Sequence, residues 1–261
     1  MTKGRLEKRF GLLKKEGRKA FIPYIMCGDP TLEKTGRMVR LLEECGADAI
    51  ELGVPFSDPL ADGAVIQAAG QRALAAGVNL RVSMEFIKKL RDQTGLPLIL
   101  MTYYNPIFRY GEEAFAKDAP ACGVDGVIIP DLPVEEGLAI SGEAARHGLD
   151  VIFLAAPTSG DDRLKKVARA SRGFIYFVSI TGITGAKLDV SDRLRASVEK
   201  LKKVSKKPVM VGFGISTPEE AATVSSIADG VVIGSAIVKA AGELPEARLR
   251  EYLLALRAAI K

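Results

Sequence analysis

Two carboxylic acids, Glu51 and Asp62, stand where proton transfer could be carried out. Glu51 lies inside the apolar run Ala49–Val54, and burial among aliphatic side chains raises the pKa of a carboxyl group toward neutrality. Asp62 follows in a polar loop, where a carboxylate stays solvated. Two carboxyl groups in such contrasting environments can divide the roles of acid and base, so we predict that both are catalytic. The competing interpretation is that Glu51 faces outward and pairs with Lys or Arg, and that Asp62 only caps a helix.

Glycine-rich turns in the last third of the chain favour the binding of an anion. They follow three apolar runs, at residues 181–185, 212–216 and 234–238, and the last two lead into helices. Backbone N–H groups and the helix dipole attract phosphate at such places, although any one of these could be only a tight turn. Together they predict a phosphorylated ligand. The predicted phosphate-binding residues are Thr184, Gly185, Gly214, Gly234 and Ser235.

Other kinds of chemistry find no support in the sequence. The only histidine, His147, sits at a predicted helix end, and one histidine cannot build a multi-histidine metal site. No lysine falls inside a predicted strand, so a Schiff-base nucleophile is lacking. Cys27 ends an apolar run and is expected to be a small buried hydrophobe. We therefore expect acid and base chemistry on a phosphate ester, with no metal and no cofactor in this chain.

The elements that must position these residues alternate along the whole chain. Eight short runs rich in Val, Ile, Leu and aromatic residues predict β-strands. These runs are Ala20–Cys27, Ala49–Val54, Leu98–Tyr103, Gly126–Pro130, Val151–Ala156, Phe174–Ser179, Pro208–Gly212 and Gly230–Gly234. Helical spacing predicts helices that include Thr2–Glu16, Leu32–Cys45, Ala64–Ala76, Val82–Thr94, Glu135–His147, Asp161–Ala170, Val190–Val204 and Thr217–Ser226.

Regular alternation of strand and helix predicts parallel strands covered by helices. Eight such units in 261 residues, close to the typical length of about 250, predict the α/β fold of a (β/α)8 TIM barrel, here with an extra N-terminal helix and extra helical segments. An open doubly wound sheet is the main alternative, but its glycine-rich phosphate turn should follow the first strand, where Cys27–Pro30 has no GxGxxG. No linker divides the chain, so residues 1–261 are expected to form a single domain.

Composition and charge indicate which partners and which cellular compartment to expect. Hydrophobic residues make up 48% of the chain, and the formal net charge is +5. The basic doublets are interleaved with acidic residues and lack aromatic neighbours, so we expect no nucleic-acid partner. No apolar run reaches the roughly 18 residues of a membrane span, and the chain starts as an amphipathic helix instead of a signal peptide. Three cysteines without ligand spacing fit a reducing compartment, so a cytoplasmic location is expected.

One long motif resembles a known family. The sequence ELGVPFSDPLADG at residues 51–63 is similar to the signature of the tryptophan synthase alpha subunit family. The resemblance extends over nearly the whole chain, through residues 21–30, 101–106, 125–133, 176–185, 211–216 and 234–238. It implies a TIM-barrel lyase of tryptophan biosynthesis that splits indole-3-glycerol phosphate into indole and glyceraldehyde 3-phosphate.

The resemblance also implies roles for individual residues. The two catalytic carboxylates of the family fall on Glu51 and Asp62. Glu51 would take the proton of the glycerol hydroxyl next to the indole and deliver a proton to indole C3, and Asp62 would accept the indole N–H. The implied substrate-positioning residues are Tyr176, Tyr103, Tyr24, Met101, Ile128, Phe213 and Ile233, although the apolar ones could equally be core.

A partner is implied by the resemblance alone. The family works with a pyridoxal-phosphate beta subunit that receives the indole, so an alpha2beta2 heterotetramer is expected, with no cofactor in this chain. The contact surface would match Asp58, Pro59, Asn105 and Pro133. Three alternatives stay open: a stand-alone indole-3-glycerol phosphate lyase, another phosphate-binding barrel such as a phosphosugar isomerase, and a non-catalytic binding subunit.

Overall fold

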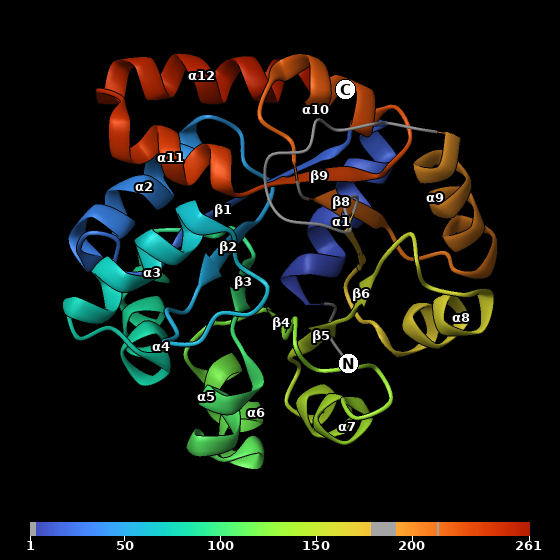
Figure 1. The fold of residues 1–261 in the computed structure, drawn as a ribbon, viewed down its shortest axis with the longest axis horizontal. Helices are drawn as coiled ribbons and strands as arrows, with labels where there is room; N and C mark the ends of the chain where they lie inside the picture. Colours follow the sequence, from blue (N-terminus) through green and yellow to red (C-terminus); the bar gives the residue numbers. More distant parts are fainter. Residues whose placement is uncertain (1–3, 179–191, 213) are drawn as a thin grey trace.

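The computed structural model describes residues 4–178, 192–212 and 214–261, and in this part nine short strands form one parallel sheet (Figure 1). The strands pair in the order β5-β4-β3-β2-β1-β9-β8-β7-β6. They are β1 (Ala20–Met26), β2 (Ile50–Gly53), β3 (Leu98–Met101), β4 (Gly126–Ile128), β5 (Asp150–Ile152), β6 (Leu154–Ala155), β7 (Ile175–Val178), β8 (Val209–Gly212) and β9 (Gly230–Ile233).

The two edge strands of this order are consecutive pieces of one segment. β5 pairs with β4, β6 pairs with β7, and only Phe153 separates the two pieces. The sheet therefore returns to its starting segment and forms a nearly closed barrel. The fifth predicted strand, Val151–Ala156, is divided because its first half bonds to one neighbour and its second half to the other. The predicted eight-unit barrel is confirmed, and an open doubly wound sheet is excluded.

Helices surround the barrel and follow its strands (Figure 1). In the described part they are α1 (Arg5–Glu16), α2 (Leu32–Glu44), α3 (Ala64–Ala75), α4 (Leu80–Leu90), α5 (Tyr104–Tyr110), α6 (Glu112–Ala121), α7 (Leu138–Arg146), α8 (Asp161–Ala170), α9 (Asp192–Val204), α10 (Pro218–Ser225), α11 (Ser235–Glu243) and α12 (Glu246–Ala259). The predicted helix Val82–Thr94 begins two residues earlier, because Asn79 caps it by accepting a hydrogen bond from the Val82 amide at 3.1 Å.

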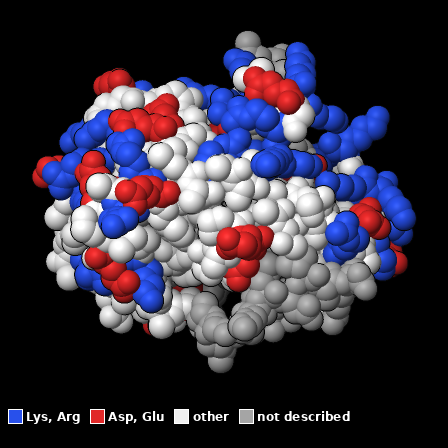
Figure 2. Space-filling model, turned by 90° about the horizontal axis from the view of Figure 1, so that it is seen from above, with Lys and Arg blue, Asp and Glu red and all other residues white. Residues whose placement is uncertain are grey.

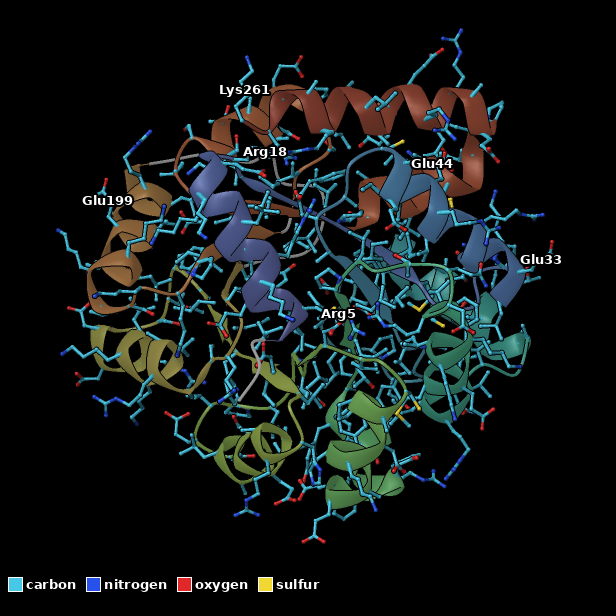
Figure 3. The ribbon with its side chains drawn as sticks, turned by 180° about the vertical axis from the view of Figure 1, so that it is seen from behind. Arg5, Arg18, Glu33, Glu44, Glu199 and Lys261 are labelled. Carbon is cyan, nitrogen blue, oxygen red and sulfur yellow. The ribbon has the colours of Figure 1, made fainter. Side chains whose placement is uncertain are left out.

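Helix α1 closes the end of the barrel at which the strands begin. Its apolar side chains Leu6, Phe10 and Leu13 are buried in one cluster with inward-facing residues of the strands. The Phe10 ring meets Phe174 edge to face, with centroids 5.7 Å apart. Figure 3 shows α1 lying across the back of the barrel, from Arg5 to the region of Arg18. Because α1 fills this end of the barrel interior, the catalytic residues are expected at the opposite end, where the strands finish.

Aspartates just before three strands hold the same closed end together. The carboxylates of Asp48, Asp125 and Asp229 accept hydrogen bonds from the first backbone N–H groups of the neighbouring strands, at 2.8, 2.9 and 3.0 Å. Two of them also hold α1, since Arg9 bonds Asp48 at 2.6 Å and Arg5 bonds Asp125 at 3.0 Å. The N-terminal helix is thus fixed to the barrel by partly buried ion pairs as well as by its apolar face.

Replacing Asp48 by Ala should destabilise the fold by about 3–5 kcal/mol, because it leaves the Arg9 guanidinium and the Phe21 amide without their buried acceptor. The Asp48 side chain is fully buried, so water cannot take its place. Urea unfolding of the purified chain would measure the change. The matched control is Glu33→Ala, which removes an exposed ion pair with Arg37 and should change the free energy of unfolding by less than about 1 kcal/mol. An Asp48 variant as stable as this control would contradict the assignment.

Charge is unevenly spread over the surface. Figure 2 shows one face of the molecule, on which Lys and Arg gather toward the side where α1 lies and a group of Asp and Glu side chains stands in a largely uncharged area in the middle of the view. Among the residues that the structure describes, no helix combines the length and apolarity needed to span a bilayer.

Candidate active site

Glu51 lies in the middle of β2 and is only 1% exposed. Its strand is flanked by β1 and β3, with Tyr24 and Ile99 as the paired residues. One carboxylate oxygen, Oε2, has no hydrogen-bond partner within the described part of the chain. Burial raises the pKa of Glu51 from 4.5 to about 8, and the nearby charge of Asp62 adds to the rise. The outward-facing alternative, with a Lys or Arg partner, does not describe this residue.

Asp62 occupies the loop between β2 and α3 and is partly buried. Burial raises its pKa from 3.8 to about 6, and hydrogen bonding to the Tyr103 hydroxyl lowers it. The same hydroxyl accepts a hydrogen bond of 2.9 Å from the Ala61 amide, so Tyr103 holds the backbone next to Asp62. At neutral pH, Asp62 is therefore mainly ionised while Glu51 is mainly protonated.

Three buried tyrosines surround the two carboxyl groups. Tyr24 from β1, Tyr103 after β3 and Tyr176 from β7 are at most 6% exposed. Burial raises the pKa of Tyr24 and Tyr176 well above 10, with further contributions from Glu51 to both and from Asp62 to Tyr24. The tyrosines are thus neutral hydroxyls within electrostatic reach of the carboxyl groups. The structure brings together the two carboxyl groups predicted to be catalytic and the three tyrosines that the resemblance implied as substrate-positioning residues.

Two glycines make room for these tyrosine rings. A Cβ atom on Gly53 would lie 2.0 Å from the Tyr24 hydroxyl oxygen, and one on Gly212 would lie 2.3 Å from that of Tyr176. In both cases the glycine sits on the strand next to the tyrosine, two residues beyond its pairing partner. Any side chain at either position would displace the tyrosine ring.

The inner apolar wall differs in one residue from the prediction. Ile128 is in the inward-facing cluster and Met101 packs against it, as a wall of an indole pocket requires. Ile233, however, packs in the outer layer between strands and helices, while Val232 faces inward beside Tyr176. The prediction of Ile233 was wrong because neighbouring strand residues point to opposite faces, and an all-apolar strand does not reveal which face is inner. Phe213 lies outside the described residues.

The predicted phosphate-binding residues that the structure describes lie on two turns. These turns differ in whether a side chain caps the helix that follows. Gly214, with a φ of 77°, precedes α10, whose amides are already engaged because Thr217 and Glu220 form a capping box. Gly234 is the N-cap of α11 and Ser235 its first residue, and within the described part of the chain no side chain caps this helix. The start of α11 is therefore a place where backbone N–H groups can meet an anion. Gly234 also lies against Tyr24, with a Cβ position 3.6 Å from that residue. Thr184 and Gly185 lie outside the described residues.

The residues predicted for partner contact lie in loops and helix starts beyond β2, β3 and β4. Asp58 and Asn105 are exposed, and Pro59 and Pro133 are partly exposed. The same segments carry two large apolar side chains that the sequence analysis missed, Leu60 with 89% and Phe108 with 66% exposure. Apolar residues of this size within predicted loops were the available signal. Large exposed apolar side chains favour a surface that another protein covers.

His147 and Cys27 were not assigned to the chemistry in the sequence analysis. They either lie apart from the two carboxyl groups or are unreactive. His147 ends α7 and its ring lies 3.3 Å from the Glu143 carboxylate, on an exposed helix. Cys27 is fully buried, and burial raises the pKa of its thiol to about 12, which leaves it protonated and unreactive. The site is therefore built from carboxyl groups, phenols and backbone amides.

Comparisons with known proteins agree over nearly the whole chain. A sequence model of the family described as tryptophan synthase alpha chain matches residues 10–258. The tryptophan synthase alpha chain of Geotalea uraniireducens is 50% identical over 257 residues, which cover 98% of this chain and 96% of that protein. Among solved structures, tryptophan synthase subunit alpha from Legionella pneumophila has a TM-score of 0.90 and 38% identity over 99% of each chain. The same TM-score, identity and coverage hold for a chain of tryptophan synthase from M. tuberculosis in an open form.

Proposed function

The chain belongs to the tryptophan synthase alpha chain family, and from this premise we propose that Glu51 and Asp62 are its catalytic groups. The reaction is the lyase cleavage of indole-3-glycerol phosphate in tryptophan biosynthesis. The observation that carries the assignment of residues is a buried Glu51 carboxyl whose pKa is raised to about 8, coupled to Asp62 and enclosed by three tyrosines.

The protonation states at neutral pH suit the proposed division of roles. A protonated Glu51 delivers its proton to C3 of the indole ring, which makes the ring a cationic indolenine. The ionised Asp62 accepts a hydrogen bond from the indole N–H and stabilises that positive charge. The bond between C3 and the glycerol carbon then breaks, its electrons return to the ring, and the Glu51 carboxylate takes the hydroxyl proton. Indole and glyceraldehyde 3-phosphate leave, with Glu51 protonated again.

The open N-terminus of α11 is proposed to hold the phosphate, with Gly234 and Ser235 as its first residues. The position of Gly234 beside Tyr24 supports a phosphate site next to the two carboxyl groups. Gly214 would contribute from the neighbouring turn, and Thr184 and Gly185 complete the proposal from the family resemblance. Binding through the phosphate fixes the indole end of the substrate against the reacting groups.

Replacing Ser235 by Asp should raise KM for indole-3-glycerol phosphate by about tenfold or more, because a carboxylate at the start of α11 competes with the phosphate for the same amides. Steady-state kinetics would measure this, together with inhibition by glycerol 3-phosphate, which should weaken in parallel. Ser226→Asp, the same change at the exposed end of α10, is the matched control. Equal KM values in the two variants would argue against a phosphate site at α11.

The function itself is tested by incubating the purified chain with indole-3-glycerol phosphate, alone and with a tryptophan synthase beta subunit. We expect slow release of indole and glyceraldehyde 3-phosphate alone and faster cleavage with the partner. Equally fast cleavage without a partner would instead identify a stand-alone lyase. No indole under either condition would leave another phosphate-binding barrel or a non-catalytic subunit.

A beta subunit is the partner that family membership implies, and the chain itself belongs to a family without a cofactor in this subunit. We further propose that the partner carries pyridoxal phosphate and that the assembly is an alpha2beta2 heterotetramer. The proposed contact surface consists of Asp58, Pro59, Leu60, Asn105, Phe108 and Pro133. Its support is the exposure of Leu60 and Phe108 beside the residues named from the resemblance.

Replacing Phe108 by Asp should weaken association with the beta subunit at least about tenfold, since a central aromatic side chain often dominates an interface. Titration calorimetry of the two purified subunits would measure the affinity. Cleavage of indole-3-glycerol phosphate by the isolated variant should be unchanged. Leu254→Asp serves as the control, because Leu254 is 48% exposed on α12, far from α5 (Figure 1). If both variants bind the beta subunit like the unmodified chain, Phe108 is not in the interface.

Two broader proposals complete this assignment. We propose that the whole chain is one domain, which predicts a single cooperative unfolding transition. We also propose a cytoplasmic location, because all three cysteines are free and two are buried, as suits a reducing compartment.

A further inference from the structure

A groove of about 730 Å³ opens on the side of the barrel, between α2, α3 and α11. Figure 1 shows these three helices grouped on one side of the barrel around β1. The groove reaches down to β1, where Ile25 and Met26 line it, and Met38 and Val238 form its apolar walls. Its volume falls within the roughly 300–1,000 Å³ of pockets that hold small molecules. Among the described residues, none of those assigned to catalysis or phosphate binding lines it.

Charged residues surround this apolar floor and carry a positive excess. Arg72 and Asp29 neutralise each other through two hydrogen bonds of 2.7 and 2.8 Å. Lys34 on α2 and Lys239 on α11 also line the groove, and within the residues that the structure describes neither has an ion-pair partner. The carboxylate of Glu243 offsets one of these two charges. A ligand that complements the groove therefore has an apolar body and one negative charge.

Two walls of the groove are helices that start at the active site. α3 begins directly after Asp62 and Gly63, and it lines the groove with Val65, Ala68 and Arg72. α11 begins at Ser235, where the phosphate is proposed to bind, and it lines the groove further along with Val238 and Lys239. A helix moves largely as a rigid body, so displacement of either helix by a ligand changes the position of its first residues.

We propose that this groove is a second ligand site, which binds a small amphipathic carboxylate with its chain on the apolar floor and its carboxylate between Lys34 and Lys239. Occupation of the site separates α3 from α11 and alters binding of the phosphorylated substrate. Ligand binding at the groove stands independently of the proposed catalytic residues, and its effect on the reaction rests on the proposed phosphate site.

The test uses octanoate as the probe and titration calorimetry of the full chain as the readout. Octanoate should bind with glycerol 3-phosphate present at saturation, whereas acetate, which lacks the chain, and octan-1-ol, which lacks the charge, should bind more weakly. The double variant Lys34→Glu, Lys239→Glu should bind octanoate at least about tenfold more weakly, since charge-assisted hydrogen bonds contribute on this scale. Lys89→Glu, on the exposed face of α4, is the matched charge control and should bind normally.

A filling variant gives a second, independent check. Ala68 is an exposed helical residue, so Ala68→Phe should fold normally while its ring occupies the groove and abolishes octanoate binding. In the unmodified chain, octanoate should change KM for indole-3-glycerol phosphate severalfold, and this effect should vanish in Ala68→Phe.

Three results would overturn the proposal. The first is no octanoate binding up to its solubility limit. The second is binding of octanoate to Ala68→Phe with the affinity of the unmodified chain. The third is displacement of octanoate by glycerol 3-phosphate, together with normal octanoate binding by the lysine double variant. Binding at the groove without any change in KM would overturn its regulatory part alone.

Discussion

Changing Glu51 to Gln should lower kcat for cleavage of indole-3-glycerol phosphate by about 10²- to 10⁴-fold, the usual contribution of a general acid or base. Glutamine keeps the size and the hydrogen-bonding capacity of the side chain but cannot donate or accept the proton that C3 of the ring and the glycerol hydroxyl exchange. Binding of glycerol 3-phosphate should persist, because the proposed phosphate site lies at the start of α11. Glu85→Gln, on an exposed face of α4, should keep full activity.

Measuring the free energy of unfolding of Glu51→Gln against pH distinguishes a loss of catalysis from a loss of folding. The pKa of Glu51 rises from 4.5 to about 8 on folding, so the folded chain holds a proton that the unfolded chain releases. The stability that this group contributes is complete below about pH 4.5 and is lost as the pH rises through 8. Glu51→Gln removes that dependence, so above pH 8 it should be at least as stable as the unmodified chain. An inactive variant that also unfolds more easily at this pH would weaken the catalytic assignment.

Changing Asp62 to Asn should lower kcat by at least about a hundredfold, because the positive charge that develops on the indole ring loses its counter-charge. The variant should also alter the ionisation of its neighbour. The charge of Asp62 contributes to the raised pKa of Glu51, so its removal should move the upper apparent pKa of the remaining activity below 8. The pH profile of kcat/KM, measured for both proteins, provides the comparison.

The control for this change is Asp92→Asn, an exposed carboxylate that follows α4, which should leave both rate and pH profile unaltered. A loss of activity in Asp62→Asn with an unshifted profile would mean that the two carboxyl groups do not interact. Retained activity would remove Asp62 from the mechanism, and Tyr103, which bonds the Ala61 amide, would then only hold a loop.

The family, the barrel and the lyase reaction predicted from the sequence are confirmed. The roles of Glu51 and Asp62 stay predictions, although burial and coupling agree with them. The outcome for Ile233 shows where pattern reasoning fails. A shift of one residue along a strand moves the side chain from the inner to the outer face of the barrel. Where every residue of the strand is apolar, the sequence does not show which side chains face inward.

The ends of two helices were also treated too simply in the prediction. Both α10 and α11 follow glycine turns, and phosphate binding was predicted at both alike, although Thr217 and Glu220 have the spacing of a capping box. The structure shows that Glu220 accepts a hydrogen bond from the Ser216 amide at 2.7 Å, whereas α11 has no such cap. Of these two helix N-termini, only that of α11 is therefore left without a side-chain cap among the described residues.

The sequence by itself determined the order of strands and helices, the barrel and the two carboxyl groups, because periodicity and turn residues act over a few neighbouring positions. Only the tertiary structure decided how β5 and β6 divide one segment to close the sheet, which side chains face inward, and that Glu51 is buried beside Asp62 and three tyrosines. These features depend on contacts between residues far apart in the chain. The raised pKa of Glu51 arises from that packing, since desolvation is a property of the whole barrel interior.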